Sequence, residues 1–177
     1  MAEGNNETMD LKIYPDEILR GSCKPVREIA RREAERMKRM LDFMYRCDGV
    51  GLAGPQGGWK EKVVTVGVGE EGDGPRIFVN PRITSSEGES EMEEGCLSLP
   101  GVRAEVKRAE RITVVAYTLD GKRIEEEMEG LRARAWQHEV DHLHGMLFID
   151  RLEPTQLVGL RRKLKELRRK AQEKESR

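Results

Sequence analysis

The chain has 177 residues, of which 37% are charged and 37% hydrophobic, and its formal net charge is −1. This length is enough for one domain with a substantial core, and the composition excludes fibrous and membrane-spanning proteins. The near-zero charge argues against a protein that binds nucleic acid over its whole surface. With three cysteines and no secretory signal, we expect reduced thiols in a cytosol-like compartment.

The N-terminal half predicts one helix followed by strands. We expect residues 1–10 to be a disordered lead-in and residues 11–177 to form a single domain. Residues 25–48 are predicted to be a helix, because apolar residues recur there at helical spacing and Gly49 suits its end. After the glycine-rich run at 49–58, strand-like segments at 62–68 and 76–83 flank an acidic, glycine-rich turn. Residues 85–95 are polar and predict a loop.

The C-terminal half predicts more strands and then two helices. Strands are predicted at 102–107, 111–119 and 122–128, and Asp120-Gly121 is a strong hairpin signal between the last two. Residues 131–143 and 154–172 show helical patterns. The last helix should pack on the body or on a partner through a narrow stripe of Leu157, Leu160, Leu164 and Leu167. This order of elements indicates an α+β domain with a mostly antiparallel sheet.

The three histidines of the chain lie within seven residues, in the segment QHEVDHLHG at 137–145. His138 and His142 are four positions apart, so on a helix both imidazoles lie on one face and can bind one metal ion. Glu139 completes the H-E-x-x-H pattern, in which the glutamate acts as a base and is not a ligand. His144 points away from that face, so we interpret it as a surface or outer residue. The alternative is a solvated helix end.

A catalytic metal usually has three protein ligands, and no residue after the histidine pair offers a suitable third one. Cys96, in EEGCLSLPG, is the upstream candidate, because glycine and proline residues around it indicate a specially shaped backbone. Cys23 and Cys47 are interpreted as structural. The pattern therefore predicts a metallohydrolase whose single ion is bound by Cys96, His138 and His142.

The glycine-rich run begins with GVGLAG at 49–54, which matches the G-x-G-x-x-G of dinucleotide-binding proteins. We reject that interpretation because a predicted helix precedes the run and Pro55 follows it at once. Glycines also let a backbone pass close to a ligand or metal. Gln56 then offers a neutral amide that can donate a hydrogen bond to a developing oxyanion. A surface turn is the alternative for Gly57-Gly58.

Three motifs in order resemble those of the peptide deformylase family: GVGLAGPQ at 49–56, EGCLS at 94–98 and QHEVDH at 137–142. PDEILR near the N-terminus and NPRI at 80–83 are also similar, so the resemblance extends from about Leu11 to the C-terminal helix. The family usually has alanine where this chain has Gly54 and proline where it has Glu17. Neither departure removes a catalytic group, although Gly54 is expected to loosen the loop that carries Gln56.

The resemblance implies a fold and an activity. The fold has antiparallel β-sheets around a central helix that carries the H-E-x-x-H motif. The activity is a hydrolase step in protein biosynthesis, a co-translational N-terminal processing reaction. It removes the formyl group from the N-terminal formyl-methionine of nascent polypeptides and releases formate. The implied metal is Fe(II), with Zn(II) or Ni(II) as substitutes, bound by the cysteine and the histidine pair with water in the fourth position.

The resemblance also implies roles for further residues. Glu139 would accept a proton from the water and deliver it to the leaving amine. The side chain of Gln56 and the backbone N–H of Leu97 would stabilise the oxyanion. The methionine pocket would be formed by Val50, Met92, Leu131 and Ala135, with Gly51 and Gly95 along the path of the peptide.

Two other classes of function stay open. A zinc metalloprotease shares the H-E-x-x-H pattern, and an inactive binding module would use the basic C-terminal helix as its working part. From Arg161 onward that helix has nine lysines and arginines against three glutamates. This predicts contact with the ribosome or, alternatively, a solvated face. We expect a monomer in the cytoplasm, or in an organelle of bacterial origin, without membrane association or sequence-specific binding of nucleic acid.

Overall fold

A computed structural model describes residues 9–67 and 76–176 of the chain. The α-helices are α1 (Arg31–Arg46), α2 (Gly130–Leu143) and α3 (Pro154–Glu175). The strands are β1 (Gly51–Ala53), β2 (Val63–Val66), β3 (Arg76–Glu87), β4 (Ser90–Gly95), β5 (Arg103–Arg108), β6 (Arg111–Tyr117) and β7 (Arg123–Glu129). Short 3-10 helices are η1 (Glu17–Arg20), η2 (Gly54–Gly57) and η3 (Phe148–Arg151). None of the helices in the described ranges combines the length and apolar character needed to cross a bilayer.

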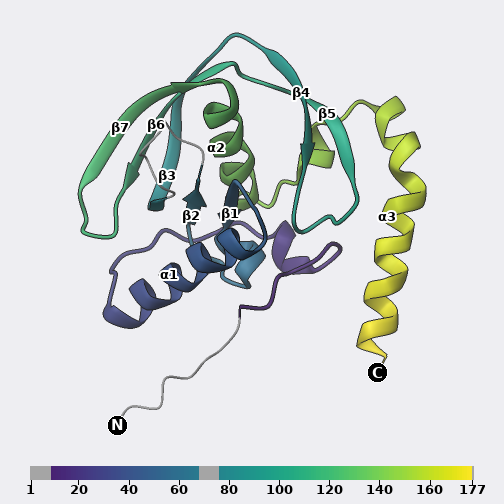
Figure 1. The fold of residues 1–177 in the computed structure, drawn as a ribbon, viewed down its shortest axis with the longest axis horizontal. Helices are drawn as coiled ribbons and strands as arrows, with labels where there is room; N and C mark the ends of the chain where they lie inside the picture. Colours follow the sequence, from purple (N-terminus) through teal and green to yellow (C-terminus); the bar gives the residue numbers. More distant parts are fainter. Residues whose placement is uncertain (1–8, 68–75, 177) are drawn as a thin grey trace.

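The strands form two antiparallel sheets around α2. The larger sheet has the order β1-β2-β3-β6-β7, and β4 pairs only with β5. Figure 1 shows α2 between the two sheets, with α1 below the larger sheet and α3 at the outer side of the β4–β5 pair. This arrangement confirms the expected α+β class with mostly antiparallel sheets and a C-terminal helix.

The larger sheet is covered on both faces where β2 crosses it. Successive side chains of a strand point to opposite faces. Val63 therefore packs with the methionines of α1, whereas Val64 packs with the residues of α2. On the α2 face, the rings of Phe78 and Trp136 have centroids 4.7 Å apart. Burial on both faces explains why all four residues of β2 are buried and all but Thr65 are apolar.

The leucine stripe of α3 packs on the body of the protein, which is one of the two arrangements that the sequence predicts. Leu160 is buried in a cluster with Tyr14 and Phe148, and the other three leucines are partly buried against that cluster. Arg168 also donates hydrogen bonds to the hydroxyl of Tyr14. The helix continues three residues past the expected end at 172.

The first helix begins later than the sequence predicts. Residues 25–30 are not helical, and α1 begins at Arg31. The reason is a pair of hydrogen bonds between the backbone of Val26 and the side chain of Asn80, each 2.8 Å long. Lys24 also forms a parallel bridge with Glu61. These contacts hold the segment in an extended conformation beside the sheet.

The expected loop at 85–95 is wrong, because this segment contains the end of β3 and all of β4. The end of β3 pairs with β6, with Ser86 opposite Ile112. Most side chains of β4 are exposed and only Glu94 is buried. Backbone pairing therefore forms these strands without the apolar alternation that sequence reasoning needs.

The hairpin expected at Asp120-Gly121 is confirmed. Gly121 has a φ of +81°, a conformation that glycine adopts without steric cost. Its N–H donates to the carbonyl of Thr118, and the N–H of Thr118 donates to the carbonyl of Lys122.

The expected acidic turn after β2 lies almost entirely outside the described residues, as do residues 1–8 of the expected lead-in. Met9 packs against the apolar cluster that contains the buried methionines of α1.

Candidate metal centre

Helix α2 carries the H-E-x-x-H residues in the interior of the protein. His142 is 1% exposed, and its ring centroid lies 5.0 Å from that of His138, as expected for residues one helical turn apart. Cys96 follows directly after β4, and its Sγ lies 3.3 Å from Nε2 of His142. One potential ligand atom from each of the three residues lies within 4.8 Å of the other two.

The chemistry of these three residues fits a bound cation. Burial alone would lower the pKa of His138, but hydrogen bonds with Cys96 and Glu94 raise that pKa well above its ordinary value. Burial and the neighbouring His138 lower the pKa of His142 well below its ordinary value. The pKa of one imidazole is thus raised by its anionic neighbours, and that of the other is lowered by burial and the adjacent positive charge. One thiolate and two imidazoles are a donor set that divalent transition metals accept.

Glu94 was missed by the sequence reasoning, yet it contacts His138 directly. Its Oε2 lies 2.9 Å from Nδ1 of His138, and Arg108 and Arg134 donate to the same carboxylate. Burial opposes the charged form, but the hydrogen bonds with His138 and Arg108 lower the pKa of Glu94 to about 2. A carboxylate at Nδ1 leaves Nε2 of the imidazole to face the metal site.

A network of buried charges extends from Glu94 to the end of α2. The side chain of Arg108 is fully buried, and it bridges Glu94 to Asp141 with an Nη1–Oδ2 distance of 2.8 Å. Arg151 in η3 donates two hydrogen bonds of 2.6 Å to Asp141. The network therefore joins β4, β5, α2 and η3 around the histidine pair.

Glu139 lies beside the metal ligands without a partner for one oxygen. The residue is 3% exposed, and its Oε2 is buried without a hydrogen bond. Burial raises the pKa of Glu139 to about 7, although the charge of His138 opposes this shift. An added Cβ at Gly51 would lie 2.4 Å from Oε1 of Glu139. Only glycine in β1 therefore allows this close approach.

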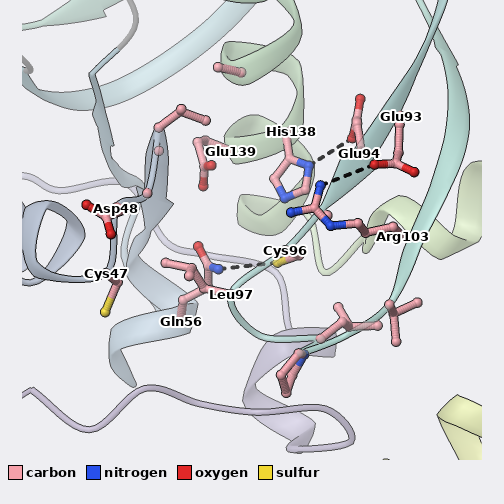
Figure 2. A pocket seen from close by; sticks show the side chains of 18 of the residues that line it. Cys47, Asp48, Gln56, Glu93, Glu94, Cys96, Leu97, Arg103, His138 and Glu139 are labelled. Atoms are coloured by element: carbon pink, nitrogen blue, oxygen red, sulfur yellow. Dashed lines mark hydrogen bonds and ion pairs between the residues drawn. The ribbon is translucent and has the colours of Figure 1, made fainter.

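Gln56 in η2 is held with its amide nitrogen toward the candidate ligands. Its Oε1 accepts a 2.8 Å hydrogen bond from the backbone N–H of Ala53. Its Nε2 lies 3.5 Å from Sγ of Cys96 and 3.2 Å from the hydroxyl of Ser98, a contact that the sequence did not suggest. Figure 2 shows the Gln56 amide directed at Cys96, with Leu97 beside it.

The turn that holds Gln56 is tightly packed at Gly54. An added Cβ there would lie 2.6 Å from the carbonyl oxygen of Glu61 and 3.1 Å from that of Trp59. The expectation that glycine loosens this turn is therefore not supported. Glycine instead lets two backbone segments approach each other closely.

A cavity of about 580 Å³ opens onto this site (Figure 2). It is lined by His138, Glu139, Gln56, Cys96 and Leu97, and also by the expected substrate residues Val50, Gly51, Gly95, Leu131 and Ala135. Val50 and Leu131 are about half exposed at 52% and 50%. Met92 does not line this cavity, and its side chain on β4 is exposed. An ion pair between Glu93 and Arg103, which the sequence did not suggest, lies on the cavity lining.

The remaining histidine and cysteines lie apart from the three candidate ligands. His144 is exposed, and its Nδ1 donates to the carbonyl of Val140. Cys23 is buried in the core between the sheet and α2, and burial raises the pKa of its thiol to about 11. Cys47 lines the cavity wall but is not part of the ligand cluster. Cys23 thus fits its expected structural role.

Comparison with known proteins identifies the family. The family model for polypeptide deformylase matches residues 8–157. The peptide deformylase of Thermodesulfovibrio yellowstonii is 42% identical over 159 residues, 89% of this chain and 96% of that protein. That of Halothermothrix orenii is 44% identical over 144 residues, 81% of this chain and 93% of that protein.

Solved structures agree with this assignment. The crystal structure of Arabidopsis thaliana peptide deformylase 1B in complex with an inhibitor has a TM-score of 0.88 and 37% identity, covering 94% of this chain and 93% of that one. A peptide deformylase from Legionella pneumophila has a TM-score of 0.83 and 42% identity, covering 90% and 95%. The chain is therefore an enzyme that belongs to the peptide deformylase family.

Proposed function

We propose that this enzyme removes the formyl group from the N-terminal formyl-methionine of nascent polypeptides and releases formate. One observation carries the proposal. A cluster of one cysteine and two histidines lies at a cavity, beside Glu139, whose Oε2 is buried and has no hydrogen-bond partner. Family membership supports a deformylase activity, and this geometry supplies a site where an amide can be hydrolysed.

Cys96, His138 and His142 would hold one divalent cation. We propose Fe(II), with Zn(II) or Ni(II) as substitutes, because a thiolate with two neutral imidazoles leaves the site with a single positive charge that Fe(II) tolerates. When bound, such an ion supplies Lewis acidity to the reacting amide.

Glu139 moves the protons in this proposal. A carboxyl group whose pKa burial raises to about 7 can both accept and release a proton near neutral pH. Its unpartnered Oε2 accepts a proton from the attacking water. The same oxygen then donates that proton to the amine nitrogen that leaves when the C–N bond breaks.

Gln56 and Leu97 stabilise the oxyanion that forms at the formyl oxygen when water attacks the formyl carbon. The hydrogen bond from Ala53 fixes the carbonyl end of the Gln56 amide, so its NH₂ group faces the site. The backbone N–H of Leu97 would supply the second donor. Donors that are fixed in place before the reaction stabilise developing charge at little reorganisation cost.

The cavity would bind the methionine side chain and the peptide behind it. Val50, Leu131 and Ala135 offer an apolar wall, and the half-exposed Val50 and Leu131 leave the mouth open to a chain end. Gly51 and Gly95 provide backbone along the path of the peptide. Because one chain contributes all of these residues, a monomer suffices, and we place its work in the cytoplasm, where nascent chains emerge.

The test is a formate-release assay on enzyme purified without oxygen, with metal content measured on the same sample. A formylated Met-peptide should release formate, and an unformylated peptide with internal bonds should stay intact. Glu139→Gln should lower kcat by about 10²–10⁴-fold while metal content stays near that of the parent. Cleavage of internal bonds alone, or full activity of Glu139→Gln, would contradict the proposal.

A further inference from the structure

A second cavity of about 570 Å³ lies on the other side of α2 from the metal centre. Its lining comes from the bulged middle of β3, from the ends of β6 and β7 that meet at their hairpin, and from the C-terminal end of α2. Val140 and His144 of α2 line it, whereas Ala135, His138 and Glu139 line the first cavity. The deformylase reaction proposed above uses none of its residues.

Positive charge dominates this second cavity. Lys62, Arg82 and Arg123 line it, and its lining contains no aspartate or glutamate. Arg123 donates to Glu125 at 2.7 Å, but no carboxylate in the described ranges forms an ion pair with Lys62 or Arg82. Two of the three cations, Lys62 and Arg82, thus have no carboxylate partner among the described residues, and such cations attract anions. This local excess stands out in a chain whose overall net charge is −1.

A bulge in β3 shapes the cavity. Val79 pairs with Tyr117 and Arg82 pairs with Val115, so β3 has one extra residue between these two pairs. Within the bulge, Asn80 has a φ of +51°, a backbone conformation that is uncommon for residues other than glycine. Its two hydrogen bonds to Val26 hold it there. Bulges change the direction of the following side chains and often lie next to active sites.

The rest of the lining is partly apolar and aromatic. Tyr117 is 39% exposed and lies at the cavity with Ile83 and Val115. An aromatic ring beside cations can stack on a planar base while the cations bind the phosphate of the same ligand. The volume is within the range of pockets that hold ligands of nucleotide size.

We propose that this cavity binds a nucleotide, with its phosphate held by Lys62, Arg82 and Arg123 and its base stacked on Tyr117. The phosphate and base can come from a free mononucleotide or from single-stranded RNA. Neither contact distinguishes one base from another, so the binding is not sequence-specific.

The test follows backbone amide resonances of the full-length, metal-loaded enzyme at constant ionic strength. Inorganic phosphate, adenosine 5′-monophosphate and a uridine hexanucleotide are added in separate titrations. Resonances of Arg82, Tyr117 and Arg123 should shift in all three. Arg82→Gln should raise each Kd about tenfold through the loss of one charged hydrogen-bond donor. Tyr117→Ala should weaken the mononucleotide but leave inorganic phosphate unchanged.

Arg32→Gln is the matched control, because it removes an exposed cation from α1, away from both cavities. Its Kd values should equal those of the parent. Tighter binding of the hexanucleotide than of the mononucleotide would assign the site to RNA, and equal binding would assign it to a free nucleotide. The proposal fails if the cavity resonances do not move, or if Arg82→Gln binds as tightly as the parent.

Discussion

Two buried carboxyl groups near His138 differ in protonation because their surroundings differ. Hydrogen bonds with His138 and Arg108 overcome the burial of Glu94 and lower its pKa to about 2. Glu139 has an oxygen without a partner, and burial raises its pKa to about 7. Paired carboxyls whose pKa values move apart commonly have separate roles. We therefore propose that Glu94 stays charged and positions His138, and that Glu139 exchanges a proton in the reaction.

We expect Glu94→Gln to weaken metal binding by 10- to 100-fold, because the side chain that orients a metal ligand loses its charge. The measurement is metal retained during titration with a chelator, at a temperature where circular dichroism shows the variant to be folded. Asp141→Asn is the control, since it disturbs the same Arg108 without touching His138. If Glu94→Gln and the parent lose metal at the same chelator concentration, Glu94 does not position the histidine.

The sequence predicted the residues whose relation is local. His138 and His142 could be paired because helical spacing alone places them one turn apart. Cys96 was reached by elimination, and the structure brings it to the pair. Glu94 could not be predicted, because its burial depends on how β4 pairs with β5 and on Arg108 from that partner strand. Nothing in the local pattern separates Glu94 from its exposed neighbour Glu93.

At the scale of elements, η2 and the segment before β2 are packed backbone against backbone. Gly54→Ala should force them apart, because its Cβ would meet the Glu61 carbonyl oxygen at 2.6 Å. We expect a loss of about 1–3 kcal/mol in the free energy of unfolding, together with lower kcat as Gln56 moves. Urea unfolding and the formate assay measure the two effects.

Gly159→Ala is the matched control for this glycine. Apart from its chain neighbours and the nearby backbone of its own helix, no described heavy atom would lie within 4 Å of its Cβ, and alanine is favoured over glycine by about 1 kcal/mol inside a helix. It should therefore stabilise the protein. A Gly54→Ala variant that is equally stabilised and fully active would show that the turn shifts freely.

Element boundaries were harder to predict than the elements themselves. Residues 25–30 have the apolar spacing of a helix, but hydrogen bonds from Asn80, more than 50 residues away in sequence, keep Val26 extended. Likewise, β4 forms through pairing with β5 although most of its side chains are exposed. Long-range pairing overrides local propensity in both segments.

At the scale of the whole molecule, we propose that residues 11–177 form one cooperative domain that includes α3. Leu160 is 8% exposed, in a cluster shared with η1, η3 and β5. Leu160→Ala should therefore cost about 2–5 kcal/mol, whereas Val158→Ala on the exposed face should cost little. Circular dichroism and tryptophan fluorescence should report a single coincident transition in urea. Separate transitions would show that α3 unfolds independently.

The same packing determines how ribosome contact by α3 must be tested. Deleting the helix would expose the apolar cluster beneath it, so a loss of binding would have two explanations. Arg161, Arg162 and Lys165 are exposed and form no ion pair with any described residue. Replacing all three by glutamine removes charge and leaves the leucine stripe intact. If α3 contacts ribosomal RNA, co-sedimentation with ribosomes should weaken.

The dependence on salt distinguishes contact with phosphate from a general loss of charge. Each lost phosphate contact should reduce the slope of log K against log salt by about 0.7–0.9, so the triple variant should have a slope shallower by about two to three. The control variant changes net charge equally, because glutamine replaces three exposed cations on and before α1, namely Arg27, Arg32 and Lys38. Its slope should equal that of the parent. Equal slopes for the α3 variant and the parent would mean that its basic surface is simply solvated. In that case the charge of α3 would contribute to solubility, and its leucine stripe would be the part of the helix that the fold requires.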